Sequence, residues 1–525
     1  MKRRSIPKLL IMLLIVLLNL PFLFSEDHED IRLFLLSENS TKTHTLGKNS
    51  FSFLFLNWIK DGPKWVNLQQ DDRFFSKNIS SVVQEATSKF SLSKANLDIF
   101  YSQRASDLTT APQNKKKYVQ AGLEVTAINL LVWSYSMYLE KREWANISWK
   151  SVFNNLRQGY EWDNNSFQTN QFSHPYHGAM YYSAARANGL NLLESGAYTA
   201  IGSLMWEFIL ETNRPSQNDS IMTTFGGMAL GEALYKIADL VYDGNSTGFE
   251  RTLRNAFAFL INPVFGYKIF TGQTSHFRKP FEQHFYSLKL PVGFFSLTSR
   301  RAGFLVSTQM EYKDYLKKEV VTVKPYDWFS LNLSLGAYDN GIYDTEVSIT
   351  GVLTGKKMKN GLPGLYGIFE YIRTDLNGKI SAVGIGPGVV LNSSSTSGHF
   401  FNSNCIVSTI FGGTDPSFDP ESCHFGKGTE NPYYLGPGIL GRVNLEYGKA
   451  DIGSIGVGLS QYWINAMFTD VNEFLTILSF DLYYPLSDRL EFNIGYDYSV
   501  RNALFQEARF HREKHSIRVL CAYRF

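Results

Sequence analysis

The apolar and polar positions of this chain follow two different periods, one after the other. Between residues 115 and 263, apolar residues recur with a spacing close to 3.6, the period of a helix with one apolar face. The clearest segments are 118–139, 178–187, 194–210 and 221–241, with a shorter one at 252–260. Asp219 stands just before the fourth segment, where it can cap the helix. The pattern predicts a helical domain over residues 115–263.

From about residue 283 to the end, the period changes to two. In the segment 490–500, Leu490, Phe492 and Ile494 alternate with Glu491, Asn493 and Gly495. The segments 329–336 and 442–447 alternate in the same way. Each such segment is predicted to be a β-strand with one apolar and one polar face.

These strands recur about ten to twelve times and have the length that crosses a bilayer when tilted. Some connections are short, such as 484–488, whereas 412–432 is long. The chain also holds 40 Phe, 29 Tyr and 9 Trp, an aromatic excess that suits the girdles of a membrane barrel better than a soluble β-sandwich. The predicted fold class is therefore α+β: a helical N-terminal domain followed, over residues 283–525, by a transmembrane antiparallel β-barrel of about 10–12 strands.

The last predicted strand carries an aromatic residue at its end. Its two faces are formed by Ile517, Val519, Cys521, Tyr523 and Phe525 on one side and by Ser516, Arg518, Leu520, Ala522 and Arg524 on the other. A terminal aromatic in this register resembles the C-terminal signature of bacterial outer-membrane barrels, which the barrel assembly machinery recognises. We expect Phe525 to face lipid and the last strand to pair with the first, because an open edge in lipid is costly.

The N-terminus has the pattern of a secretory signal. Lys2, Arg3, Arg4 and Lys8 precede an apolar run at 9–24, and the chain turns acidic after Ser25. This predicts a signal peptide over residues 1–25, with an uncleaved anchor helix as the alternative. Residues 26–114 form a mixed region without a clear period. The predicted location is the bacterial outer membrane, with membrane lipid as a partner.

Charge and cysteine content narrow the possibilities further. The net charge is +3 and Lys and Arg are not concentrated in any segment, which argues against a nucleic-acid partner. Three cysteines do not make a disulfide scaffold. Cys405 and Cys423 flank a Gly- and Pro-containing stretch, and whether they form a disulfide is left open.

The most distinctive segment runs from residue 170 to residue 234. Its notable elements are His174–Pro175–Tyr176–His177–Gly178, Tyr181, Arg186, Trp206–Glu207, Pro215–Ser216, Asp219 and the spaced glycines Gly226, Gly227 and Gly231. These elements resemble the bacterial family known as domain of unknown function 3943, over roughly residues 115–245. The resemblance implies a cell-envelope location and no particular activity. Residues 207–231 also resemble, faintly, the helical hairpin of VanZ-like proteins.

Four polar residues of this segment are candidate site residues. His174, His177, Glu207 and Asp219 would form a polar cluster in an otherwise apolar bundle, suited to acid–base chemistry or to holding a metal ion. In the structural alternative, the histidines cap a helix, Glu207 pairs with Arg186 or Arg214, and Asp219 is only a cap. No cofactor motif of the Walker, Rossmann or CxxC kind is present in the sequence.

Three functions remain open on this basis. The first is an outer-membrane barrel whose helical domain plugs the lumen or caps its periplasmic mouth, with no assigned molecular activity. The second is a lipid- or cell-envelope-modifying enzyme with its site among His174, His177, Glu207 and Asp219. The third is a passive channel for small solutes, permitted by small polar residues such as Ser330, Asn332 and Ser334 on the inner face.

Overall fold

The computed structural model describes residues 116–162, 165–244, 246–273, 286–297, 302–316, 322–338, 343–414, 433–467, 471–504 and 509–525. The predicted signal peptide at 1–25, the mixed region at 26–114 and Cys423 lie outside the described residues. All described residues belong to one compact unit.

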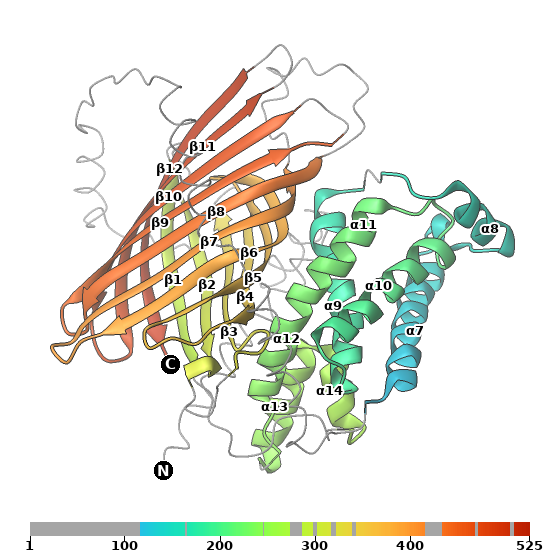
Figure 1. Cartoon of the computed structure of the whole chain (residues 1–525), viewed down its shortest axis with the longest axis horizontal. Coiled ribbons are helices and arrows are strands. Elements are labelled where there is room, and N and C mark those ends of the chain that lie inside the picture. Colours follow the sequence, from blue (N-terminus) through green and yellow to red (C-terminus); the bar gives the residue numbers. More distant parts are fainter. Residues whose placement is uncertain are drawn as a thin grey trace, which may run out of the picture. The chain divides into compact units, whose positions relative to one another are not determined.

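The first part of this unit is helical (Figure 1). Its elements are α7 (Tyr118–Ser134), η2 (Tyr135–Leu139), η3 (Glu143–Ala145), α8 (Trp149–Gln158), η4 (Thr169–Ser173), α9 (His174–Ala187), α10 (Leu192–Ile209), α11 (Gln217–Ile221), η5 (Met222–Gly226), α12 (Gly227–Val241), α13 (Gly248–Ile261) and α14 (Pro263–Phe270). Three of them, η2, η4 and η5, are π-helical turns. Among the described helices, none combines the length and the apolar character needed to cross a membrane.

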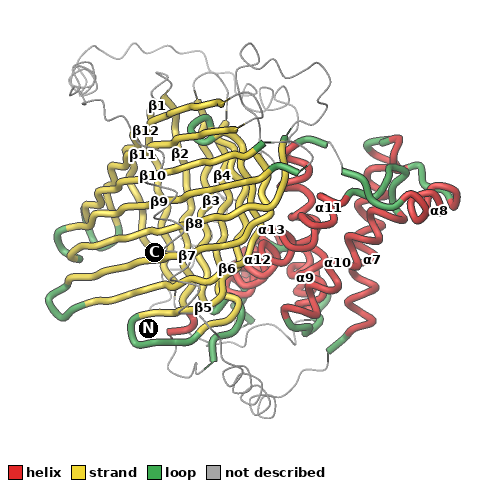
Figure 2. The backbone as a smooth tube through the Cα atoms, turned by 45° about the horizontal axis from the view of Figure 1, so that its top comes forward, coloured by secondary structure: helices red, strands yellow, loops and turns green. Residues whose placement is uncertain are grey.

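The second part is a closed barrel of twelve antiparallel strands, as Figure 2 shows. The strands are β1 (Tyr286–Leu297), β2 (Ala302–Lys313), β3 (Trp328–Tyr338), β4 (Tyr343–Gly355), β5 (Gly361–Thr374), β6 (Gly378–Ser394), β7 (His399–Thr414), β8 (Tyr434–Lys449), β9 (Gly453–Asn465), β10 (Asn472–Pro485), β11 (Leu490–Leu504) and β12 (Arg509–Arg524). Each strand pairs with its neighbour in sequence, and β1 pairs with β12. The predicted fold class is therefore confirmed.

The seam between the first and last strands closes the sheet. It runs in register from Lys289 opposite Arg524 to Leu297 opposite Ser516. Beyond this ladder the backbone N–H of Phe525 donates to the carbonyl oxygen of Leu288 at 3.0 Å. The ring of Phe525 lies 4.7 Å from that of Tyr523, on the same outward-facing register. Every strand thus has two partners, and the sheet has no open edge.

The strands alternate between the lumen and the outside, as the period of two predicts. Along β11, Glu491 and Asn493 are buried, whereas Ile494 and Tyr496 are exposed. Along this strand, polar side chains point inward and apolar ones outward, the reverse of a soluble domain. This is the arrangement of an outer-membrane barrel, and the chain is a barrel of that kind with a helical part before it.

The helices cross at glycines. A Cβ atom added to Gly178 of α9 would lie 1.9 Å from the carbonyl oxygen of Thr223, and one added to Gly227 would lie 2.6 Å from the Cα atom of Gly178. Gly231 faces the ring of Tyr182 in the same crossing. The glycines at 178, 227 and 231 thus allow two helix backbones to approach closely.

Candidate functional site

The candidate histidine–carboxylate site is built where two π-helical turns lead into α-helices. The turn η4 ends at Ser173 and α9 begins at His174, while Thr223 lies in η5, directly before α12. Pro175 has no N–H to donate, and it follows directly on the π-helical turn η4, where the regular helical hydrogen-bond pattern is already interrupted. The sequence suggested that the histidines precede a helix starting near 178, whereas they lie inside it. Single π-helical turns often mark functional sites, since they redirect the side chains around them.

Three of the four predicted site residues come together here. The ligand-type atoms of His174, Glu207 and Asp219 all lie within 4.8 Å of one another. His174 Nε2 is 3.5 Å from Asp219 Oδ2, and its other ring nitrogen, Nδ1, is 3.2 Å from Thr223 Oγ1. The three residues come from α9, α10 and α11, so the site depends on the tertiary structure of the helical part.

Both carboxylates are held by neighbouring polar groups. The Ser216 N–H donates to Glu207 Oε2 at 2.7 Å, and the Ser216 hydroxyl accepts from the Asp219 N–H at 3.1 Å. Asn218 Nδ2 donates to Asp219 Oδ1 at 3.3 Å. The expectation that Asp219 caps the helix after it is wrong, because Ser216 is the cap. The Asp219 carboxylate therefore turns toward His174 instead.

Glu207 is in an unfavourable electrostatic setting for a charged group. Only 1% of the residue is exposed. Burial raises its pKa well above the ordinary value, and the negative charges of Glu211 and Asp219 raise it further. Close, buried carboxyl groups are stable together only with a shared proton or with a cation between them.

The arginine partners expected for Glu207 are engaged elsewhere. Arg186 makes two hydrogen bonds to Glu232, at 2.7 and 3.1 Å, and Arg214 pairs with Glu161 at 3.2 Å. The structural alternative in which Glu207 pairs with Arg186 or Arg214 is therefore wrong.

His177 lies next to the cluster but outside it. Its Nε2 atom is 2.9 Å from the hydroxyl of Tyr181, which also bonds to Asn129, and its ring lies 5.1 Å from that of Trp206. Burial lowers the pKa of His177 to about 3, and the charge of His174 adds to that effect. His177 is therefore a neutral, packed histidine that supports the wall of the site.

Sequence reasoning missed several residues that shape this site. Thr223 and Ser216 contact the candidate residues directly, and Glu232 takes the arginine that Glu207 was expected to bind. Ser216 had a detectable signal, because a serine three residues before an acidic residue commonly caps a helix. Thr223 had none, since a π-helical turn shifts the helical phase from which its neighbours would be inferred.

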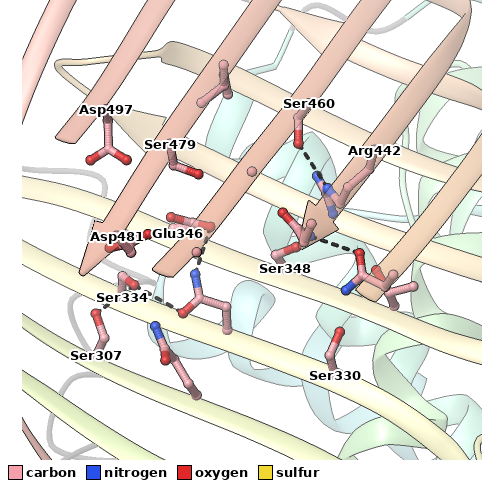
Figure 3. Close-up of a pocket in the computed structure, with 18 of the residues that line it drawn as sticks. Ser307, Ser330, Ser334, Glu346, Ser348, Arg442, Ser460, Ser479, Asp481 and Asp497 are labelled. Carbon is pink, nitrogen blue, oxygen red and sulfur yellow. Dashed lines mark hydrogen bonds between the residues drawn. The ribbon is translucent and has the colours of Figure 1, made fainter. Parts of the chain in front are cut away.

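A second polar site lies in the barrel lumen (Figure 3). It is a cavity of about 600 Å³, lined by strand residues and by Leu376 and Asn377 of one turn. The small inner-face residues Ser330, Asn332 and Ser334 do line it. Arg442 and the carboxylates of Asp481 and Asp497 supply charge (Figure 3).

Polar bonds cross this lumen between strands that are not neighbours. Glu370 of β5 pairs with Arg442 of β8 at 2.5 Å and accepts from the hydroxyl of Tyr462 of β9 at 2.7 Å. Lys514 of β12 pairs at 2.5 Å with Asp375, which follows β5. On the inner side of β5 to β9, apolar side chains such as Ile368 pack together in a buried cluster. Side chains thus fill much of the lumen, as expected for a barrel of this size.

Comparison with known proteins gives structural neighbours of the barrel. They include the NanC porin (13% identity, TM-score 0.27, covering 45% of this chain and 98% of that one). The KdgM porin matches at 11% identity and a TM-score of 0.22, covering 46% and 99%. The translocator domain of the autotransporter NalP from Neisseria meningitidis matches at 11% and 0.23, covering 47% and 90%.

No curated protein matches the chain by sequence. A family model does match part of it, and that part contains His174, Glu207 and Asp219. Residues 159–264 match the family described as Domain of unknown function (DUF3943), the same family that the histidine and glycine motifs resemble.

Proposed function

We propose that the barrel anchors the helical part in the outer membrane and that the helical part binds a divalent metal ion at His174, Glu207 and Asp219. The observation that carries this proposal is the convergence of one imidazole and two carboxylates within 4.8 Å, in a buried site. A cation between these groups would also offset the repulsion between the buried carboxylates.

The distances are compatible with a single ion. Nitrogen and oxygen ligands bind zinc at about 2.1 Å, so two ligands of one ion lie at most about 4.2 Å apart. The 3.5 Å separation between His174 Nε2 and Asp219 Oδ2 is within this limit. A small rotation of a carboxylate brings the third ligand within reach. One nitrogen and two oxygen donors suit zinc, manganese or iron better than calcium or copper(I).

The surrounding hydrogen bonds are those that orient metal ligands. When His174 Nδ1 carries a proton, it donates to the hydroxyl of Thr223, and the unprotonated Nε2 faces Asp219 as a candidate metal ligand. Ser216 and Asn218 each hold one oxygen of a carboxylate, so that the other oxygen can turn to the ion.

A metal-dependent enzyme acting on envelope lipid or cell-wall material is the second candidate. His174, Glu207 and Asp219 would hold the ion by three ligands and leave one position for water, and the ion would supply the Lewis acidity that hydrolysis of an ester or amide requires. His174 supports this candidate because 14% of its side chain is exposed, so the site has an edge open to the surroundings. His177 takes no part in this chemistry, because it bonds to Tyr181 and packs against Trp206 outside the cluster.

Metal analysis of the purified full chain tests the proposal. After chelation and incubation with zinc or manganese, the protein should retain about one ion per chain, since the site has one ligand set. His174→Ala and Asp219→Asn should remove most of that metal. The matched controls are His399→Ala and Asp451→Asn, which alter residues of the barrel far from this site.

Equal metal retention by the site variants and the controls would contradict the cation site. A fold check by heat-modifiable gel mobility, which reports an intact barrel, must accompany every variant. A variant that loses metal while its barrel stays folded supports the site.

The passive channel receives less support. The bonds from Glu370 to Arg442 and to Tyr462 cross the lumen, and the apolar cluster fills one side of it. We therefore infer that the barrel serves mainly as an anchor. Steady conductance of the wild-type protein in a planar lipid bilayer would overturn this inference.

We further propose that membrane lipid surrounds the barrel and that the barrel assembly machinery inserts it, with Phe525 in the recognised strand. For the helical part, the sequence suggested the lumen or the periplasm. We propose a position outside the lumen, supported by the lining of the cavity, which contains strand and turn residues and none of the described helical residues.

A further inference from the structure

The exposed face of the helix α7 carries large apolar side chains, which a helix in water normally buries. Its buried positions are Ala121, Val125 and Asn129, two small or medium residues and an amide. Its most exposed side chains include Leu123 and Leu131, which are 66% and 70% exposed. A helix beside water normally shows the opposite arrangement, with large apolar residues inside.

The helix α10 shows the same inversion. Its buried side includes Ser195, Thr199 and Ser203. Its exposed side carries Leu193, Ile201 and Leu204. Small and polar residues between helices, with large apolar residues outside, are the pattern of helices that face lipid.

Charged and aromatic residues stand at the ends of the apolar stripe on α7. Lys116 and Lys117 precede it. The four charged residues Glu-Lys-Arg-Glu at 140–143 follow it, with Tyr138 and Trp144 close on either side. Exposed tyrosines at both ends match the interfacial positions that tyrosine favours in membrane proteins.

The helical part also adjoins the outward-facing side of the barrel. The ring of Phe167 lies 5.6 Å from that of Tyr371 on β5, and the ring of Trp162 lies 6.1 Å from that of Phe411 on β7. The Ser381 hydroxyl of β6 donates to Gln171 at 2.6 Å. These strand residues alternate with the lumen-lining ones, so the contacted face is the one that lipid covers elsewhere on the barrel.

We propose that the exposed faces of α7 and α10 bind the acyl chains of the membrane that surrounds the barrel. The helical part would then share the lipid environment of the barrel wall rather than stand in water. The exposed side chains of α7 and α10 on this surface include no ligand of the proposed metal site, so lipid contact and metal binding are independent.

Spin labels on the apolar stripes test this inference directly. In a background with Cys405, Cys423 and Cys521 replaced by serine, single cysteines replace Leu123 or Leu204 and receive a nitroxide. The full chain is reconstituted into phosphatidylethanolamine–phosphatidylglycerol vesicles. Collision with oxygen, which dissolves in lipid, is compared with collision with nickel ethylenediaminediacetate, which stays in water.

Two reference labels calibrate the ratio of oxygen to nickel collisions. Phe480→Cys lies on the outward face of β10, where the side chain is 47% exposed, and Asp488→Cys lies in the turn after it. We expect the Leu123 and Leu204 labels to match the Phe480 label and to exceed the Asp488 label several-fold.

Two results would overturn the inference. A ratio matching that of Asp488 would mean that water covers the stripe. Low collision with both reagents would mean that protein covers it, whether another segment of this chain or a second copy. Heat-modifiable mobility of each labelled protein confirms that the barrel is folded, so neither result can arise from misfolding.

Discussion

At the scale of single residues, the pairing of charges inside the helical part determines which groups surround Glu207. Arg186 was expected to bind Glu207, but it binds Glu232 of α12 and lies 5.2 Å above the ring of Tyr235. Tyr182 also donates to Glu232, at 2.8 Å. Glu207 therefore lies near the carboxylates of Glu211 and Asp219 and beside His174. A cation bound between these groups would offset their repulsion, which is the basis of the proposed metal site.

Glu232→Gln should destabilise the crossing of α9 and α12. The change leaves the Arg186 charge partly buried without its carboxylate, at a cost of about 3 kcal/mol. Glu140→Gln is the control, since Glu140 and its partner Arg142 are 34% and 51% exposed and the change should cost about 0.5 kcal/mol. Hydrogen exchange of the α9 amides measures both. Equal protection in the two variants would contradict the structural role of the Arg186–Glu232 pair.

His177 makes the stability of its own helix, α9, depend on pH. Its pKa is about 3 in the folded protein and near 6.5 in the unfolded chain. Its contribution to the free energy of unfolding is therefore complete above pH 7 and decreases as the pH falls from 6.5 toward 3. The loss should reach about 2 kcal/mol at pH 5.

Hydrogen exchange of α9 peptides, corrected for the intrinsic effect of pH, measures this dependence. His177→Gln should flatten it, whereas His399→Gln in the barrel should not. An unchanged slope in His177→Gln would show that another group is responsible.

At the scale of elements, the helical part is held by close approach of backbones at glycine. Gly178→Ala should force α9 away from Thr223, because its new Cβ would lie 1.9 Å from a backbone oxygen. We expect a loss of about 2 kcal/mol or more in the stability of this crossing.

Gly122→Ala in α7 is the matched control, and it should increase stability rather than decrease it. A Cβ at this position meets only Tyr198, at 3.6 Å, and an alanine stabilises a helix interior by about 0.5–1 kcal/mol. Thermal unfolding followed by circular dichroism at 222 nm compares the two. A destabilised Gly122→Ala together with an unaffected Gly178→Ala would contradict the observed packing.

The long helices could be predicted from their apolar period, whereas a short helix and the exact start of another were missed. The segments expected at 118–139 and 194–210 agree closely with α7–η2 and α10. The helix α8 was missed although Trp149, Val152, Phe153 and Leu156 follow the helical period and Ser148 caps it with a reciprocal bond to Ser151; at ten residues it is short. The start of α9 was placed too late, near residue 178, because only 178–187 shows the apolar period, whereas the helix already includes His174 and Pro175.

At the scale of the whole molecule, alternation along each strand was enough to predict a barrel. It could not give the bonds across the lumen, such as Glu370 with Arg442, because these depend on which strands lie opposite each other after closure. The sequence did name His174, Glu207 and Asp219 as members of one cluster, but it could not exclude His177 or give the distances, since the helix crossings and the π-helical turns fix the geometry.

Closure of the barrel should be sensitive to Phe525. Phe525→Ala removes the ring contact with Tyr523 at the β1–β12 seam while leaving the backbone bond to Leu288. The folded fraction in the outer membrane, measured by heat-modifiable mobility, should decrease. Phe480→Ala, on the outward face away from the seam, is the control and should have a smaller effect. Equal folded fractions in the two variants would count against a special role of the seam.

Anomalous X-ray diffraction from crystals of the full chain grown with manganese or zinc tests the central claim most directly. The account predicts a peak about 2.0–2.2 Å from His174 Nε2 and from one oxygen each of Asp219 and Glu207. Crystals of His174→Ala should lack that peak. A wild-type crystal with anomalous peaks only at surface histidines such as His399 and His511, and none between His174, Glu207 and Asp219, would contradict it.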